Sequence, residues 1–154
     1  MKLLIFAIGN DRYGLRTDSI IRLLPMLALS HIAHSPYYVA GLMNYRSVQV
    51  PVIDLQMLTC DIPCEARFDT RIIVVDYAGP DGAHHLLGLM VEQVVGIRGS
   101  DERTLVDAGV ARTAAPYLGK ITVDGAGIVQ LIEVDQLLPK AVRAILFQPH
   151  GVPC

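Results

Sequence analysis

The feature that most constrains the fold of this chain is an internal repeat. Three short segments of the first half recur in the second half, each 74 to 79 residues later. The matching pairs are YGLRTDSII (13–21) with LGLMVEQVV (87–95), VIDLQML (52–58) with LIEVDQL (131–137), and Gly41 with Gly119. A repeat at a nearly constant spacing predicts two copies of one structural unit. Each copy is too small to bury a full core alone, so we expect the two to pack together and to leave a groove between them.

The repeated unit has the pattern of β-structure. Its apolar runs are short, rich in β-branched residues and separated by turn residues, which is typical of strands joined in hairpins. The expected hairpins are KLLIFAI (2–8) with YGLRT (13–17), RIIVVDY (71–77) with HLLGLMV (85–91), and the two arms of KITVDGAGIVQLI (120–132). Short helical segments are expected at 35–42, 54–58 and 133–138. The sequence therefore predicts an all-β protein with a few short helical segments.

Two of the predicted strands carry residues that a fully buried strand does not accommodate. VQVPVIDL (48–55) contains Pro51, which cannot donate to a ladder, so we expect this strand at a sheet edge or a bulge. In SIIRLL, three large apolar residues surround an arginine. Because successive side chains of a strand point to opposite faces, Ile20, Ile21 and Leu23 cannot all face the core. At least one of them is expected to face a groove or water.

Composition excludes several classes of protein. The 154 residues fit one ordinary domain, and the formal net charge of −2 without a basic cluster argues against nucleic acid as a partner. No run approaches 18 apolar residues, so we expect no direct membrane insertion. The odd number of cysteines, three, fits reduced thiols in a cytoplasmic protein rather than a disulfide framework.

Two sets of residues could carry chemistry. Asp54 and Glu133 could act as a general acid and base, but their equivalent places in the repeat, where a strand gives way to a helical segment, favour helix capping. A second class of function is a metal- or thiol-dependent redox protein. Its zinc ligands would be Cys60, Cys64, His31 and His34. For Cys60 and Cys64, free thiols in a loop are the favoured interpretation. The sequence contains no other catalytic motif, so we expect a protein without enzymatic activity, cofactor or metal.

A series of motifs, in order along the chain, resembles the CheW-like family of bacterial chemotaxis adaptors. The motifs are FAIGNDRYGL (6–15), SPYYVAGLMNYRS (35–47), VPVIDL (50–55), TRIIVVDY (70–77), GLMVEQVVGI (88–97), YLGKITVDG (117–125) and IVQLIEVDQLL (128–138). The resemblance implies two intertwined five-stranded SH3-like β-barrels. It also implies that residues 1–140 form a single CheW-like domain of two barrel subdomains, with 141–154 as a C-terminal tail.

The resemblance implies a function without chemistry. Members of the family couple the cytoplasmic tips of chemoreceptors, which are antiparallel helical hairpins, to the regulatory domain of a CheA-type histidine kinase. The receptor tip docks near the groove between the two barrels. The positions that the resemblance assigns to partner binding are Ile20, Ile21, Arg22, Leu23, Asn44, Arg46 and Ile97. Without the resemblance, Arg46 would be interpreted as a solvated turn residue. A structural array protein that binds the kinase without a receptor is the remaining alternative.

The chain departs from the family pattern at three positions. Ser47 stands where the family has glycine, Tyr45 where leucine is usual, and Glu92 where aspartate is common. Glycine is favoured where a turn needs a positive φ, so Ser47 predicts a remodelled or mildly strained turn beside Arg46.

Overall fold

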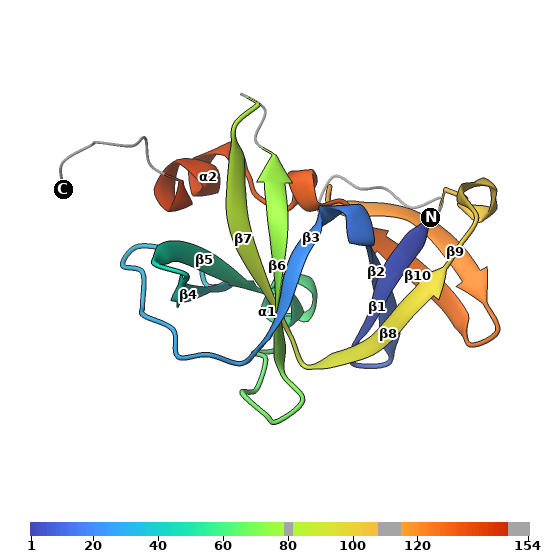
Figure 1. Cartoon of the computed structure of the whole chain (residues 1–154), viewed down its shortest axis with the longest axis horizontal. Helices are drawn as coiled ribbons and strands as arrows, with labels where there is room; N and C mark the ends of the chain where they lie inside the picture. Colours follow the sequence, from blue (N-terminus) through green and yellow to red (C-terminus); the bar gives the residue numbers. More distant parts are fainter. Residues whose placement is uncertain (79–81, 108–114, 148–154) are drawn as a thin grey trace.

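The computed structural model describes residues 1–78, 82–107 and 115–147, and these form two five-stranded sheets (Figure 1). Sheet A has the strand order β8-β1-β2-β10-β9, and sheet B has the order β3-β6-β7-β5-β4. The strands of sheet A are β1 (Lys2–Ile8), β2 (Asp11–Arg16), β8 (Gln93–Gly99), β9 (Leu118–Asp124) and β10 (Gly127–Ile132). Those of sheet B are β3 (Ile20–Pro25), β4 (Val39–Tyr45), β5 (Val48–Asp54), β6 (Arg71–Ala78) and β7 (His84–Val91).

Short helical elements connect and cover the strands. The α-helices are α1 (Leu55–Cys60) and α2 (Lys140–Leu146), and the 3-10 helices are η1 (Thr17–Ser19), η2 (Glu102–Thr104) and η3 (Val134–Gln136). α1 and η3 confirm the helical segments expected at 54–58 and 133–138. None of the helices in the described ranges is long and apolar enough to cross a membrane.

The two sheets have the same topology, which confirms the two copies of one β unit predicted from the repeat, and each sheet has the five strands that the family resemblance implies. The strands β1–β5 of the first copy correspond in order to β6–β10 of the second copy. When each strand of sheet A is replaced by its equivalent in the other copy, the order of sheet A becomes the order of sheet B. Each copy contributes to both sheets: β1 and β2 join β8–β10, whereas β6 and β7 join β3–β5. The isolated bridges beside the outer strands are repeated as well, Ser30 with Leu42 and Val106 with Ile121. The copies are therefore intertwined by exchange of strands.

The repeated Gly-Leu motif is explained by the parallel strand pair in each sheet. Gly14 of β2 lies opposite Leu131 of β10, and Gly88 of β7 lies opposite Val52 of β5. A Cβ atom would lie 3.1 Å from the Val129 side chain at Gly14 and 3.0 Å from that of Val52 at Gly88. Glycine therefore allows neighbouring side chains to fill the space above each parallel pair.

The hydrophobic core has three parts, and the largest lies between the sheets. It draws buried residues from both sheets, including Phe6 and Leu15 of sheet A and Ile73 and Leu89 of sheet B. Each sheet also wraps a small core of its own. These are Leu3, Ile5, Val129 and Leu131 in sheet A, and Met43, Val50, Val52, Ile72, Val74 and Met90 in sheet B. Because most of the core is shared, each unit depends on the other for burial.

The structure corrects two sequence-based expectations. The helix expected at 35–42 is wrong, because Val39–Tyr45 is strand β4, whose backbone pairs with β5. The edge position expected for Pro51 is wrong for β5 as a whole, because this strand lies between β7 and β4. Pairing with β7 begins only at Val52, so Pro51 has β4 as its single neighbour and its missing N–H leaves no gap in the β5–β7 ladder.

Helix α2 lies in the segment expected to be a tail. It packs against the shared core through Val142, which is buried. Residues 148–154, which include Cys154, lie outside the described residues. The domain boundary at residue 140 stays a prediction.

Candidate partner-binding surface

Strand β3 presents apolar side chains at the free edge of sheet B. It pairs with β6 alone, and the register shifts between Ile20 and Arg22, so Ile21 is the extra residue of a bulge. Ile21 and Leu23 are exposed, at 47% and 42%, whereas Ile20 is half-buried against the shared core. This confirms that the three cannot all face inward. Arg22, exposed between Ile21 and Leu23, has no ion-pair partner among the described residues.

Strand β8 presents a similar apolar edge on sheet A. It pairs with β1 alone and contains a register shift opposite Ile5 and Phe6. Val95 and Ile97 are exposed on it, at 44% and 59%. Ile97 was expected here, and Val95 was missed. The repeat contained the signal, since it aligns Val95 with Ile21 at the same offset that relates Gly88 to Gly14.

These two strands lie in the central part of the molecule, between the outer strands β4 and β9 (Figure 1). We define the β3/β8 surface by its four exposed apolar residues, Ile21, Leu23, Val95 and Ile97. Two strand edges that have a free side and carry apolar side chains are typical of a protein-binding surface, because an unpaired strand edge favours association with another chain.

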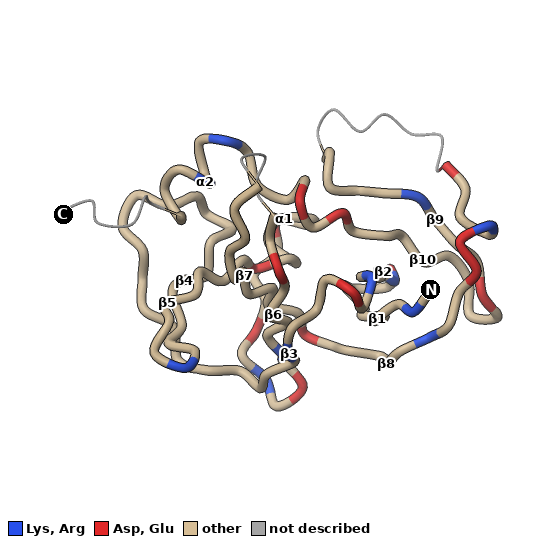
Figure 2. The backbone as a smooth tube through the Cα atoms, turned by 45° about the horizontal axis from the view of Figure 1, so that its top comes forward, with Lys and Arg blue, Asp and Glu red and all other residues tan. Residues whose placement is uncertain are grey.

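The remaining predicted residues lie on the hairpin between β4 and β5, at the other edge of sheet B. Asn44 is exposed near the end of β4, and Arg46 is exposed in the two-residue turn. Arg46 is the only charged residue between Val39 and Ile53, so nearly all of the β4 and β5 backbone is drawn in tan in Figure 2. Its guanidinium carbon lies 5.4 Å from the centre of the Tyr45 ring, a distance at which a cation–π contact forms. Three strands separate this edge from β3, so no ladder joins the two groups of residues.

The Arg46-Ser47 turn has the strain that the sequence predicts. Arg46 and Ser47 have φ angles of 50° and 67°, the positive values that both central residues of a type I′ hairpin turn require. L-residues other than glycine adopt this region at a cost of roughly 1–2 kcal/mol. The serine therefore stands at a position for which glycine is better suited.

Replacing Ser47 by glycine is expected to raise the free energy of unfolding by about 1 kcal/mol, because it removes this strain. Urea titration followed by circular dichroism measures the change. Ser47→Ala is the matched control, since it removes the hydroxyl but keeps the Cβ atom and should give no gain. Equal stability of the glycine variant and the wild type would show that the turn is unstrained.

Asp54 and Glu133 occupy equivalent capping positions, as predicted, but only one forms the side-chain bond. Asp54 is the N-cap of α1, and its carboxylate accepts the Met57 N–H at 3.0 Å and the Cys64 N–H at 2.9 Å. Burial raises the pKa of Asp54, and these N–H donors oppose the rise. Glu133 precedes η3 without a side-chain capping bond. Helix capping therefore accounts for the position of Asp54 in the fold.

Removing the Asp54 carboxylate is expected to destabilise the fold, because this side chain caps α1 and is assigned no catalytic role. Asp54→Ala should lower the free energy of unfolding by about 1–3 kcal/mol, since two partly buried N–H groups lose their acceptor. Asp54→Asn should cost less, because its amide oxygen still accepts from Met57. Chemical denaturation of both variants checks this order, and an equal loss in the two would mean that the Met57 cap contributes little.

The zinc alternative finds no support in the described part of the chain. Within residues 1–78, 82–107 and 115–147, no three His, Cys, Asp or Glu side chains lie close enough to hold a metal ion. Cys60 and Cys64 are both free, and burial raises the pKa of the Cys64 thiol to about 12, which keeps it protonated. The four residues of the redox hypothesis are thus not brought together.

Comparison with known proteins identifies the family. The family model described as "CheW-like domain" matches residues 2–142 of this chain. The chemotaxis protein CheW of Klebsiella aerogenes is 26% identical over 149 residues, covering 93% of this chain and 84% of that protein. The crystal structure of the scaffolding protein TtCheW from Thermoanaerobacter tengcongensis has the same fold, with a TM-score of 0.79 and 21% identity over 92% of this chain and 89% of that one. With the match extending over nearly all described residues, the chain belongs to the CheW-like domain family, the non-enzymatic scaffolding and adaptor proteins of chemotaxis signalling.

Proposed function

We propose that this protein couples chemoreceptors to a CheA-type histidine kinase in the cytoplasm, at receptor arrays beneath the inner membrane. The observation that carries the proposal is the β3/β8 surface, where edge strands of two different sheets expose apolar side chains. An antiparallel helical hairpin presents two neighbouring apolar helix faces, and such faces bind to apolar grooves. The receptor tip is therefore the partner assigned to this surface.

Titration with two defined fragments tests the proposal. One is a receptor-tip helical hairpin, and the other is the regulatory domain of the kinase. The protein should bind each fragment separately, and all three should co-elute as a ternary complex. Binding of the kinase domain without the receptor fragment would instead indicate a structural array protein. Failure to bind either would contradict the adaptor function.

Arg46 is assigned to orientation and specificity rather than to most of the affinity. Arg46→Ala is expected to weaken receptor binding by about 1–3 kcal/mol, the usual range for a charge-assisted hydrogen bond. Arg46→Glu should weaken it more, since repulsion replaces attraction if the receptor presents a carboxylate. Calorimetric titration measures both, with Arg46→Lys as the variant that keeps the charge. Wild-type affinity in the alanine and glutamate variants would remove Arg46 from the site.

A further inference from the structure

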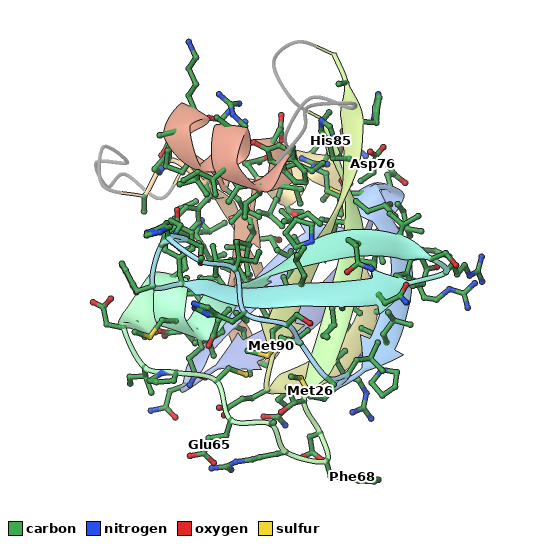
Figure 3. All side chains as sticks on the ribbon, turned by 90° about the vertical axis from the view of Figure 1, so that its left-hand side faces the viewer. Met26, Glu65, Phe68, Asp76, His85 and Met90 are labelled. Atoms are coloured by element: carbon green, nitrogen blue, oxygen red, sulfur yellow. The ribbon has the colours of Figure 1, made fainter. Side chains whose placement is uncertain are left out.

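The loop between α1 and β6 carries the most exposed large apolar side chain of the described residues. We define the Phe68 loop as residues 61–70, between α1 and β6. Phe68 is 93% exposed, and Figure 3 shows its side chain at the end of the loop, directed away from the body of the molecule. A phenylalanine in this position contributes almost nothing to the hydrophobic stability of the fold.

The first half of this loop is fixed by side chains of sheet B and its connections. The bonds are from Cys64 N to Asp54 Oδ2 at 2.9 Å, from Gln56 Nε2 to the Pro63 carbonyl at 3.2 Å, and from Glu65 N to Glu92 Oε2 at 2.9 Å. Asp54 and Gln56 are among the few buried polar residues of the described chain. Buried acceptors and donors of this kind hold a segment firmly, because breaking such a bond leaves a polar group unsatisfied.

The second half is fixed around the fully buried Thr70. Its hydroxyl donates to the Glu65 carbonyl at 2.5 Å and accepts the Arg67 N–H at 2.9 Å. On the other side, Arg71 Nη1 donates to the carbonyl of Phe68 itself at 2.7 Å. The backbone that carries the exposed ring is therefore held on both sides.

A fixed loop with an exposed aromatic tip has the properties of a binding anchor. Aromatic side chains dominate the energetics of protein interfaces when they enter a pocket, and a preordered loop loses little entropy on binding. An adaptor that holds two partners at once needs a second surface besides the first. The β3/β8 surface is assigned to the receptor, so a different surface has to bind the kinase.

We propose that Phe68 inserts into an apolar pocket with a polar rim on the regulatory domain of the kinase. The inference rests on the function proposed above and names the residue that would bind the second partner. The charges of the loop favour a protein over a lipid surface, because three acidic residues, Asp61, Glu65 and Asp69, outnumber the two arginines at and beside it. Anionic membranes attract segments with an excess of positive charge.

The test compares the two partner fragments on one variant. Phe68→Ser, in the otherwise complete chain, should weaken binding of the kinase regulatory domain by about thirtyfold, the effect of truncating an interface hot spot. Binding of the receptor-tip fragment should stay within about twofold of the wild type. Ile128→Ser is the control, since Ile128 is also a large apolar residue that is exposed, at 60%, but it lies on β10. It should leave both affinities unchanged.

A second variant tests whether the fixed loop matters beyond the ring. Thr70→Val keeps Phe68 and the volume of residue 70 but removes both hydroxyl bonds, so kinase binding should fall by about three- to tenfold in a protein that is still folded by circular dichroism. Unchanged kinase binding by folded Phe68→Ser would overturn this inference alone. Absence of kinase binding by the wild type would overturn the proposed function as well. Phe68-dependent binding to vesicles of phosphatidylglycerol and phosphatidylcholine, without an effect on the kinase, would assign the loop to a membrane and also overturn it.

Discussion

Replacing Gly41 by alanine is expected to lower the free energy of unfolding by about 3 kcal/mol or more. Gly41 lies in β4 with φ of 149°, a conformation that L-residues rarely adopt. A Cβ atom there would lie 2.5 Å from the Ser30 carbonyl oxygen and 3.1 Å from the Leu29 Cβ. Because the nearest atom belongs to the backbone, no side-chain rotation relieves the clash.

The clash also acts on the bridge that covers the outer edge of sheet B. Ser30 and Leu42 exchange backbone hydrogen bonds at 2.8 and 2.7 Å, and moving Ser30 away from a new methyl group would lengthen both. Urea unfolding measures the loss. Gly99→Ala is the matched control, since Gly99 also lies in an edge strand but has no atom within 4 Å of its added Cβ. A loss for Gly41→Ala no larger than for Gly99→Ala would refute the explanation.

The second large effect is expected on binding. Leu23→Asp should weaken binding of the receptor-tip fragment by roughly 3 kcal/mol, about a hundredfold, because it places a charge in an apolar contact. Leu23 is better suited to this test than Ile20, whose side chain packs partly against the shared core, so that its loss would also disturb folding.

The stability of the Leu23 variant should remain near that of the wild type, because the leucine is exposed in the free protein. Ile97→Asp on β8 should give a comparable loss of binding if both edges contact the hairpin. Val123→Asp, at an exposed apolar position of β9, is the control and should bind normally. A folded Leu23→Asp protein with wild-type affinity would remove β3 from the binding surface.

Much of the architecture could be predicted because the sequence contains two copies of the same structural unit. The repeat aligned Gly14 with Gly88 and Val52 with Leu131, and the structure pairs these residues across equivalent parallel strands. The cap at Asp54 could be predicted for a local reason, since an aspartate before a helical turn satisfies a backbone N–H within its own segment.

Features that depend on distant partners could not be predicted in this way. The segment at 35–42 contains no local signal strong enough to distinguish helix from strand, and the pairing of Val39 with Ile53 of β5 decides its conformation. The Phe68 loop was missed because its order comes from Asp54, Gln56 and Glu92, which lie in other elements. For the β3/β8 surface, the sequence suggested the strands, whereas the exposure of each side chain follows from the bulges in both edges.

The exchange of strands between the copies has a consequence for biosynthesis. Strands β1 and β2 leave the ribosome first, but their sheet partners β8, β9 and β10 are synthesised last. Sheet A therefore cannot close while the chain is still growing, although β3–β7 are contiguous and can pair earlier. The nascent chain must keep the apolar hairpin of β1 and β2 soluble, without its neighbours β8 and β10, until translation reaches residue 132. Slow, non-local pairing of this kind exposes a chain to aggregation, so we expect the protein to depend on chaperones during synthesis more than a protein of equal length with two sequential domains would.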